Sequence, residues 1–380
     1  MAKTPSPRAG KRVTIKGKPL PFSYWPMYKG TRRYGLHSRL YVTNPWAVIE
    51  GSIKRRCPAN SRPEALASAR QAEQFFKASR EAQLWASKPL LTYYSFLNLA
   101  KAYALTQGQR ATYDKAQHGL SESIKTSGQE LVDSVLTAYP SPNQKGIAQG
   151  FAEFLQSIRG TGLPQTTEFD VTALLPQIVT GHRLWCDAAN EPERFIAIDS
   201  IDVMENAQQK SLWIDFRIGE DSLSSLDLTH SALLTKSRLA QGWADVQGSD
   251  DGAGRWLVRF QQKTVLAYSA RPSDEIPDLI KSVRPYIWST VTTFQPFRKH
   301  YLYFCSAAEH GQVLPQLVSI YAVFYYLGSV TRYRPQQFDI LLNGPFGEQL
   351  QEALTNVPNQ FLYLMASEFA QREVTRAAIV

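Results

Sequence analysis

Two consecutive helical segments, residues 61–85 and 88–108, constrain the fold most. The first repeats small or apolar residues at steps of three and four: Ala65, Ala69, Ala72, Phe76 and Ser79. Small side chains let a neighbouring helix approach closely, and this pattern is typical of an amphipathic helix. The second segment, KPLLTYYSFLNLAKAYALTQG, has Pro89 in its first turn and Gly108 just past its end, as helices prefer. The two segments therefore predict a closely packed pair of helices.

Polar groups interrupt the second segment, but they are ordered. Tyr94, Asn98 and Lys101 are spaced four and three apart, so they share one side of the predicted helix. The opposite face is apolar and consists of Leu90, Tyr93, Leu97, Ala100 and Ala104. A hydroxyl, an amide and an ammonium together suit a phosphate or a carboxylate. The alternative is a helix rim in which Lys101 reaches solvent and Asn98 bonds a neighbouring backbone.

Two further groups extend this candidate site. His118, in the His–Gly pair that follows, either donates to a ligand near neutral pH or serves the structure. Arg332, Tyr333 and Arg334 close the apolar run 312–330. Cations are favoured at a helix C-terminus, and two arginines on a rigid helix end also suit a phosphate. We predict a single site if this end meets Lys101.

The basic charge is concentrated at the N-terminus. Residues 1–62 hold 14 Lys and Arg against one acid, whereas the rest of the chain carries a net charge of −4. Such asymmetry suggests an anionic partner, most often nucleic acid. Basic and aromatic residues are interleaved there, at Arg32, Arg33, Tyr34, His37 and Arg39. Protein surfaces that bind nucleic acid use this mixture, with charges for the phosphates and rings for the bases. The alternative is an arm that packs on an acidic neighbour, behind a mobile tail of about 18 residues.

The hydrophobic periodicity divides the chain into four segments. We expect a basic aromatic arm (1–45), a helical domain (46–192), an α+β middle section (193–271) and a C-terminal helical domain that packs on the first (272–380). The fold class is mainly α (α+β), with the strands in the small middle section. Finer predictions are a capping box at Ser61 and Glu64, helix through most of 128–160 and 165–192, a hairpin in 194–219 and a turn at Gln261–Gln262.

Several classes of protein are disfavoured. Three distant cysteines make neither a disulfide framework nor a zinc site, and no Walker A, Rossmann, nucleophile-elbow or H-E-x-x-H motif is present. No secretory signal is visible, and the run 312–330 contains Pro315 and Gly328, which favours a buried helix over a membrane span. We expect a cytoplasmic protein with no metal, no cofactor and no membrane contact; the oligomeric state stays open.

Longer motifs resemble the YaaC-like family of bacterial proteins. They are QAEQFFKASREA, KPLLTYYSFLNLAKAYALTQG, QHGL, LPQLVSIYAVFYYLGSVTRYRP and FLYLMASEFAQREV. The tyrosine-bearing helix followed by a His-containing turn is also similar to HEPN helical domains, many of which are RNases or nucleotide-binding partners. The HEPN catalytic signature is Arg, four to six residues, then His. Only Arg32 and His37 match it, in the arm, since seven residues separate Arg110 from His118.

These observations predict a protein that binds nucleic acid or a nucleotide through the basic arm and a cleft in the helical core near Lys101 and Arg332. Two alternatives stay open. One is a HEPN-type RNase in a toxin or phage-defence role, and the other is a non-catalytic partner of another protein. Whether the chain is an enzyme is left undecided.

Overall fold

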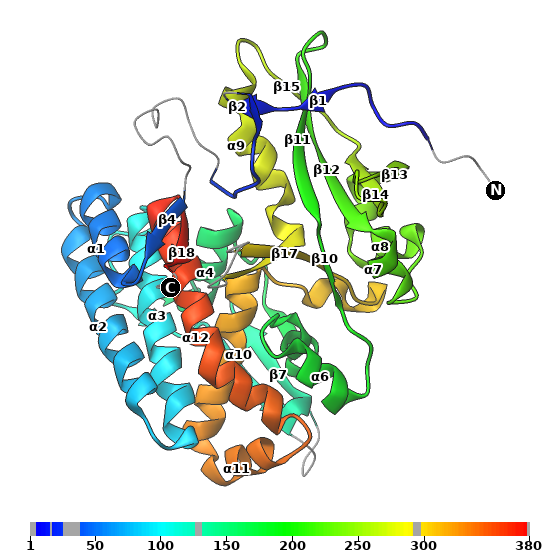
Figure 1. Cartoon of the computed structure of the whole chain (residues 1–380). Helices are drawn as coiled ribbons and strands as arrows, with labels where there is room; N and C mark the ends of the chain where they lie inside the picture. Colours follow the sequence, from blue (N-terminus) through cyan, green and yellow to red (C-terminus); the bar gives the residue numbers. More distant parts are fainter. Residues whose placement is uncertain (1–4, 16, 26–38, 126–130, 292–297, 378–380) are drawn as a thin grey trace. The chain divides into compact units, whose positions relative to one another are not determined.

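The computed structural model describes residues 5–15, 17–25, 39–125, 131–291 and 298–377 (Figure 1). The chain forms two compact units. Unit 1 is built from residues within 1–41 and 192–310, and unit 2 from Val42–Glu191 and Gly311–Ala377. The fold is mixed α+β with helix in the majority, and the helices concentrate in unit 2. None of the helices in the described residues is long and apolar enough to cross a membrane.

Unit 2 is a helical assembly with small sheets. Its helices are α1 (Pro45–Arg56), α2 (Arg62–Glu81), α3 (Lys88–Thr106), α4 (Gly150–Arg159), α5 (Val171–Leu174), α6 (His182–Ala189), α10 (Gln316–Tyr333), α11 (Pro335–Asn343) and α12 (Gly347–Ala370). Helix α3 packs against α2, α4, α10 and α12, so it is the central helix of the unit.

The predicted helix pair is confirmed as α2 and α3, which lie side by side (Figure 1). The alanines of the α2 stripe are buried, and the hydroxyl of Ser95 donates a hydrogen bond to the carbonyl of Ala72 at 2.8 Å. Gly108 has φ +71°, a left-handed conformation that glycine adopts without strain just after the helix end. The capping box is wrong: Ser61 forms no capping hydrogen bond, and Glu64 instead accepts from the backbone N–H of Tyr113.

Aromatic packing joins α3 to the C-terminal helices. Phe96 is fully buried, its ring stacks on Phe361 of α12 at 3.8 Å, and it meets Phe324 of α10 at 5.0 Å. Truncating such a residue to alanine costs about 3–5 kcal/mol. Gly328 of α10 lies so close to α3 that a Cβ there would be 3.3 Å from the Cβ of Tyr93. This close approach brings the polar residues of the two helices together.

Short strands complete unit 2. They are β5 (Ala116–Gln117), β6 (Leu120–Ile124), β7 (Ser134–Ala138), β8 (Ala148–Gln149), β9 (Thr167–Asp170) and β18 (Glu373–Arg376). Strand β7 lies between β6 and β9 in an antiparallel sheet, so the helix expected through 128–160 is limited to α4. The single helix expected over 165–192 is also wrong, because a 3-10 turn at Leu175–Gln177 and Gly181 at φ +80° separate α5 from α6.

Unit 1 is organised around an antiparallel sheet in the order β1-β11-β12-β14-β13, with β15 also paired to β12. The strands are β1 (Lys11–Arg12), β11 (Ser200–Asn206), β12 (Ser211–Gly219), β13 (Trp243–Asp250), β14 (Trp256–Gln262) and β15 (Leu266–Ala267). The expected hairpin is β11–β12. The turn expected at Gln261–Gln262 is wrong, since both residues end β14 and pair with its neighbours.

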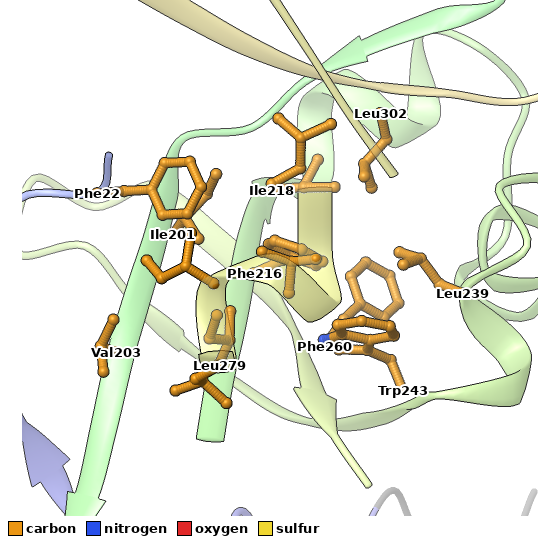
Figure 2. Close-up of a cluster of buried hydrophobic side chains, with 14 of the residues drawn as sticks. Phe22, Ile201, Val203, Phe216, Ile218, Leu239, Trp243, Phe260, Leu279 and Leu302 are labelled. Atoms are coloured by element: carbon orange, nitrogen blue, oxygen red, sulfur yellow. The ribbon is translucent and has the colours of Figure 1, made fainter. Parts of the chain in front are cut away.

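A second sheet and three helices cover one face of this sheet. They are β10 (Phe195–Ala197), β16 (Ile287–Val291), β17 (Arg298–Tyr303), α7 (Glu220–Ser224), α8 (His230–Lys236) and α9 (Pro272–Val283). Figure 2 shows the buried cluster between them, where Leu279 of α9 and Leu302 of β17 meet Phe216 and Phe260 of the main sheet. Residues 272–291 and 298–303 thus belong to the β-rich unit, whereas we expected them in the C-terminal helical domain.

The N-terminal segment is held at the edge and on the polar face of the main sheet, and its Val13, Leu20 and Phe22 belong to the buried cluster. Residues Lys11 and Arg12 pair with β11 as β1, and Arg8 lies over the ring of Trp213 at 5.0 Å. Arg12 forms an ion pair with Asp202 at 3.1 Å. The expectation of a mobile tail is therefore wrong for residues 8–12. The short strands β2 (Thr14–Ile15) and β3 (Lys18–Pro19) follow and pair with each other.

Candidate functional site

The polar stripe of α3 lies as its spacing predicts, but its members differ in role. Asn98 is buried, and its amide donates to the carbonyl of Tyr94 at 2.9 Å, one turn earlier in the same helix. Lys101 is half-buried; this burial lowers the pKa of its ammonium, and the charge of Glu64 opposes the effect. In the part of the chain that the structure describes, no carboxylate forms an ion pair with Lys101. Tyr94 and Lys101 are thus the members available to a ligand.

His118 is held beside α3 by the turn that precedes β6. Gly119 has φ +77°, and a Cβ on it would lie 2.9 Å from the carbonyl carbon of Gln149, so glycine is required there. The carbonyl of His118 accepts a hydrogen bond from the N–H of Phe151 at 2.9 Å. The imidazole is half-buried, and its Nδ1 lies 2.7 Å from the hydroxyl of Tyr93. This contact ties the turn to the central helix.

The helix end of α10 contributes Arg332. Its guanidinium donates to the hydroxyl of Tyr94 at 3.2 Å and lies over the ring of Tyr333 at 5.0 Å. Arg332 is exposed, and like Lys101 it forms no ion pair with a described carboxylate. Tyr333 exposes 65% of its surface although Arg332 lies over its ring, so part of the ring is accessible to a ligand.

Arg334 has a different role from Arg332. It forms an ion pair with Glu122 of β6, whose side chain is 8% exposed. Burial raises the pKa of Glu122, and the nearby guanidinium opposes this shift. A buried carboxylate needs such a partner, so Arg334 joins α10 to β6 and its charge is already neutralised.

Electrostatics link the three residues that the sequence singled out. The pKa of His118 is lowered first by burial and then by the positive charges of Lys101 and Arg332. Both cations therefore act on the same imidazole, which stays neutral at pH 7 because the ordinary histidine pKa is already about 6.5. We define the His118 cluster as Tyr93, Tyr94, Lys101, His118 and Arg332. It combines two cations, hydroxyl groups and a neutral imidazole.

Most of the candidate residues in the arm fall outside the described residues: Arg32, Arg33, Tyr34 and His37. Arg39 begins β4 (Arg39–Val42). Of the earlier cations, Arg8 donates to the carbonyls of Gln262 and Lys263, and Arg12 pairs with Asp202. These two arginines hold the segment on unit 1. Across the described ranges no group of three His, Cys, Asp or Glu side chains is placed to hold a metal.

Comparison with family models identifies the family of the chain. The model of the YaaC-like Protein family matches residues 35–369. The chain belongs to the YaaC-like family. The match includes α3, the His118 turn and α10, so the whole His118 cluster lies within the part that is YaaC-like. Neither a search of curated proteins nor a search of solved structures finds a significant match to this YaaC-like chain.

The sequence did not single out the tyrosines behind His118. Tyr93 and Tyr321 are buried, and their hydroxyls lie 3.5 Å apart; the ring of Tyr325 lies 5.3 Å from that of Tyr93. The only signal was two tyrosine doublets, 93–94 and 325–326, each six or seven residues before a basic residue. That spacing alone did not predict that the two helices meet.

Proposed function

We propose that this YaaC-like protein binds a phosphate-bearing ligand, a nucleotide or a nucleic-acid strand, through the His118 cluster. One observation carries the proposal: Lys101 and Arg332 act on one neutral imidazole and form no ion pair with a described carboxylate. A phosphate bound beside His118 would interact with the positive charges of both residues. Guanidinium and ammonium groups with hydroxyl donors are what a phosphate needs, and the exposed ring of Tyr333 offers a base a surface for stacking.

Binding is tested by fluorescence anisotropy with a short labelled single-stranded RNA, with AMP as competitor. We expect Lys101→Met and Arg332→Gln each to weaken binding about tenfold, since a hydrogen bond to a charged group contributes about 1.5 kcal/mol or more. The variant Lys145→Gln, which removes an exposed lysine of the same unit, is the control and should bind as the wild type does. Equal binding by all four proteins, or no binding of RNA or AMP by the wild type, would refute the proposal.

The basic arm is a second part of this proposal, supported by the charge asymmetry alone. Deleting residues 1–40 is a poor test, because it also removes β1, Arg8 and Arg12 from the sheet of unit 1. The double variant Arg32→Gln/Arg33→Gln is cleaner. If the arm contributes, this variant reduces the dependence of log K on log salt by about 0.7 for each phosphate that these two arginines neutralise. An unchanged salt dependence removes the arm from the proposal.

A HEPN-type RNase with a HEPN-like helical core is the second candidate. The observation that favours it is His118 beside two cations, since a histidine can exchange a proton with a reacting group and cations stabilise charge at a phosphate. Cleavage of the same RNA that disappears in His118→Ala and Arg332→Ala would support this candidate. Intact RNA across varied sequences would refute it.

Protein binding is the third candidate, and it draws on exposed apolar residues of unit 2. Leu84 exposes 72% of its surface and Ile340 69%, and α11, which carries Ile340, contacts the 3-10 turn Trp85–Ser87 next to Leu84. Co-purification from the native cell should then bring one stoichiometric protein that Leu84→Asp releases. Retention of that protein by the variant would exclude this surface.

A further inference from the structure

The tyrosines behind His118 form a chain of hydrogen bonds with a defined direction. Tyr321 is fully buried, and within the described residues its hydroxyl contacts only that of Tyr93, at 3.5 Å. A buried hydroxyl proton needs an acceptor, so Tyr321 donates to Tyr93. The proton of Tyr93 is then directed to its second contact, the Nδ1 of His118 at 2.7 Å.

The opposite direction fits the geometry less well. If Nδ1 carried the proton and donated to Tyr93, Tyr93 would donate to Tyr321, and the fully buried proton of Tyr321 would have no acceptor among the described residues. Burial raises the pKa of Tyr93 well above its ordinary value of about 10, so Tyr93 keeps its proton at neutral pH. Tyr93 therefore has a proton that it can donate to Nδ1 of His118.

This direction determines the other side of the imidazole. Once Nδ1 accepts a hydrogen bond, the single proton of the neutral ring is on Nε2. Nε2 forms no hydrogen bond with any described residue, and the ring is only half-buried. The charged groups that affect this ring are Lys101 from α3 and Arg332 from α10. The rings of Tyr93 and Tyr325 are tilted against it, with centroids 5.6 and 6.1 Å away.

We propose that Tyr93 is a positioning residue, which holds His118 in the Nε2–H tautomer so that the ring presents a neutral N–H donor to the ligand of the His118 cluster. The ligand half of this inference rests on the proposed function, whereas the tautomer is a property of the protein alone. A neutral donor suits a site that already contains two cations, because it adds a hydrogen bond to a phosphate oxygen without adding a third positive charge.

The tautomer is measured in the ligand-free protein by long-range ¹H–¹⁵N NMR at about pH 8, above the ordinary histidine pKa near 6.5. The signals of His118 are identified by their loss in His118→Gln. We expect Nε2 to be the protonated nitrogen in the wild type. In Tyr93→Phe both nitrogen shifts should move toward the average of the two tautomers. Tyr363→Phe, which removes a hydroxyl that donates to the carbonyl of Val42, should leave them unchanged.

A wild-type spectrum with the proton on Nδ1 would overturn the inference, and so would an unchanged His118 spectrum in Tyr93→Phe. If Tyr93→Phe does not fold, Tyr321→Phe removes the donor behind Tyr93, and the wild-type spectrum alone still decides the tautomer. None of these outcomes depends on ligand binding. A confirmed tautomer together with undiminished RNA binding by Lys101→Met and Arg332→Gln would refute the proposed function and leave the positioning role of Tyr93 intact.

Discussion

The polar face of the unit 1 sheet and the His118 cluster of unit 2 use their charged residues in opposite ways. On the polar face of the unit 1 sheet, Arg259 donates to Asp215, and Arg12 and Arg217 both pair with Asp202. In unit 2, Lys101 and Arg332 lie near one imidazole without a carboxylate partner among the described residues. Paired charges hold strands and the N-terminal segment together. Cations without a carboxylate partner do not stabilise the fold, and such cations suit an anionic ligand.

The largest expected effect comes from breaking a pair in unit 1. Asp215 is fully buried and accepts from Arg259 and Gln261. Asp215→Ala leaves the guanidinium of Arg259 desolvated and uncompensated, so we expect a loss of about 3–5 kcal/mol in the free energy of unfolding. Asp278→Ala breaks an exposed pair with Lys281 and should change it by about 0.5 kcal/mol or less. Urea denaturation measures both, and equal effects would contradict the distinction between the two pairs.

A second comparison lies within unit 2 and has a smaller expected effect. Arg334→Met leaves the buried carboxylate of Glu122 without its cation, so we expect a loss of about 2–3 kcal/mol. Lys101→Met removes a desolvated ammonium that has no ion-pair partner among the described residues, so it should cost about 1 kcal/mol or less, or raise the stability. Thermal and urea unfolding check both variants. A larger loss from Lys101→Met than from Arg334→Met would assign Lys101 to the structure.

The pH dependence of stability should have opposite signs in the two units. Burial and two cations lower the pKa of His118 in the folded state, so the unfolded state binds more protons. The contribution of His118 to stability is therefore complete above pH 6.5 and is lost as the pH falls through the folded pKa. For His230 burial lowers the pKa, but hydrogen bonds with Asp245 and Glu220 outweigh it and raise the pKa. Its contribution is complete below pH 6.5 and is lost as the pH rises through the folded pKa.

Matched variants separate these two contributions. Between about pH 5 and 8, the contribution of His118 makes the free energy of unfolding of unit 2 rise with pH, and His118→Gln should reduce this rise. The contribution of His230 makes the free energy of unfolding of unit 1 fall with pH, and His230→Gln should reduce this fall. Hydrogen exchange on backbone amides of α3 and of β13 reports the two units separately. If the free energy of unfolding changes with pH in the same direction for both histidines, the electrostatic environment described for one of them is wrong.

How much the sequence could predict depended on the range of the interactions. The boundaries of α3 followed from Pro89 and Gly108, since both signals act within one turn. Strands β7, β16 and β17 were not predicted, because strand pairing depends on another segment of the chain. A short apolar run does not reveal which segment it will pair with. The capping-box spacing at Ser61 misled because Glu64 accepts from a residue 49 positions away.

The candidate site followed the same rule. Helical spacing placed Tyr94 and Lys101 on one side of α3, and the chemistry of His118 and Arg332 marked them as candidates. These residues come near one another because α10 packs on α3 at Gly328, and no local sequence pattern predicts that contact. Tyr93 was assigned to the apolar face for the same reason: only the fold shows that its hydroxyl reaches His118.

The pKa of His118 with and without AMP tests the central claim most directly. A phosphate bound between Lys101 and Arg332 offsets the two charges that lower this pKa, and it stabilises the imidazolium. We predict that the pKa, followed by NMR, rises when AMP is added to the wild type and rises less in Arg332→Gln. An unchanged pKa at AMP concentrations that saturate a phosphate site would contradict the claim that the His118 cluster binds phosphate.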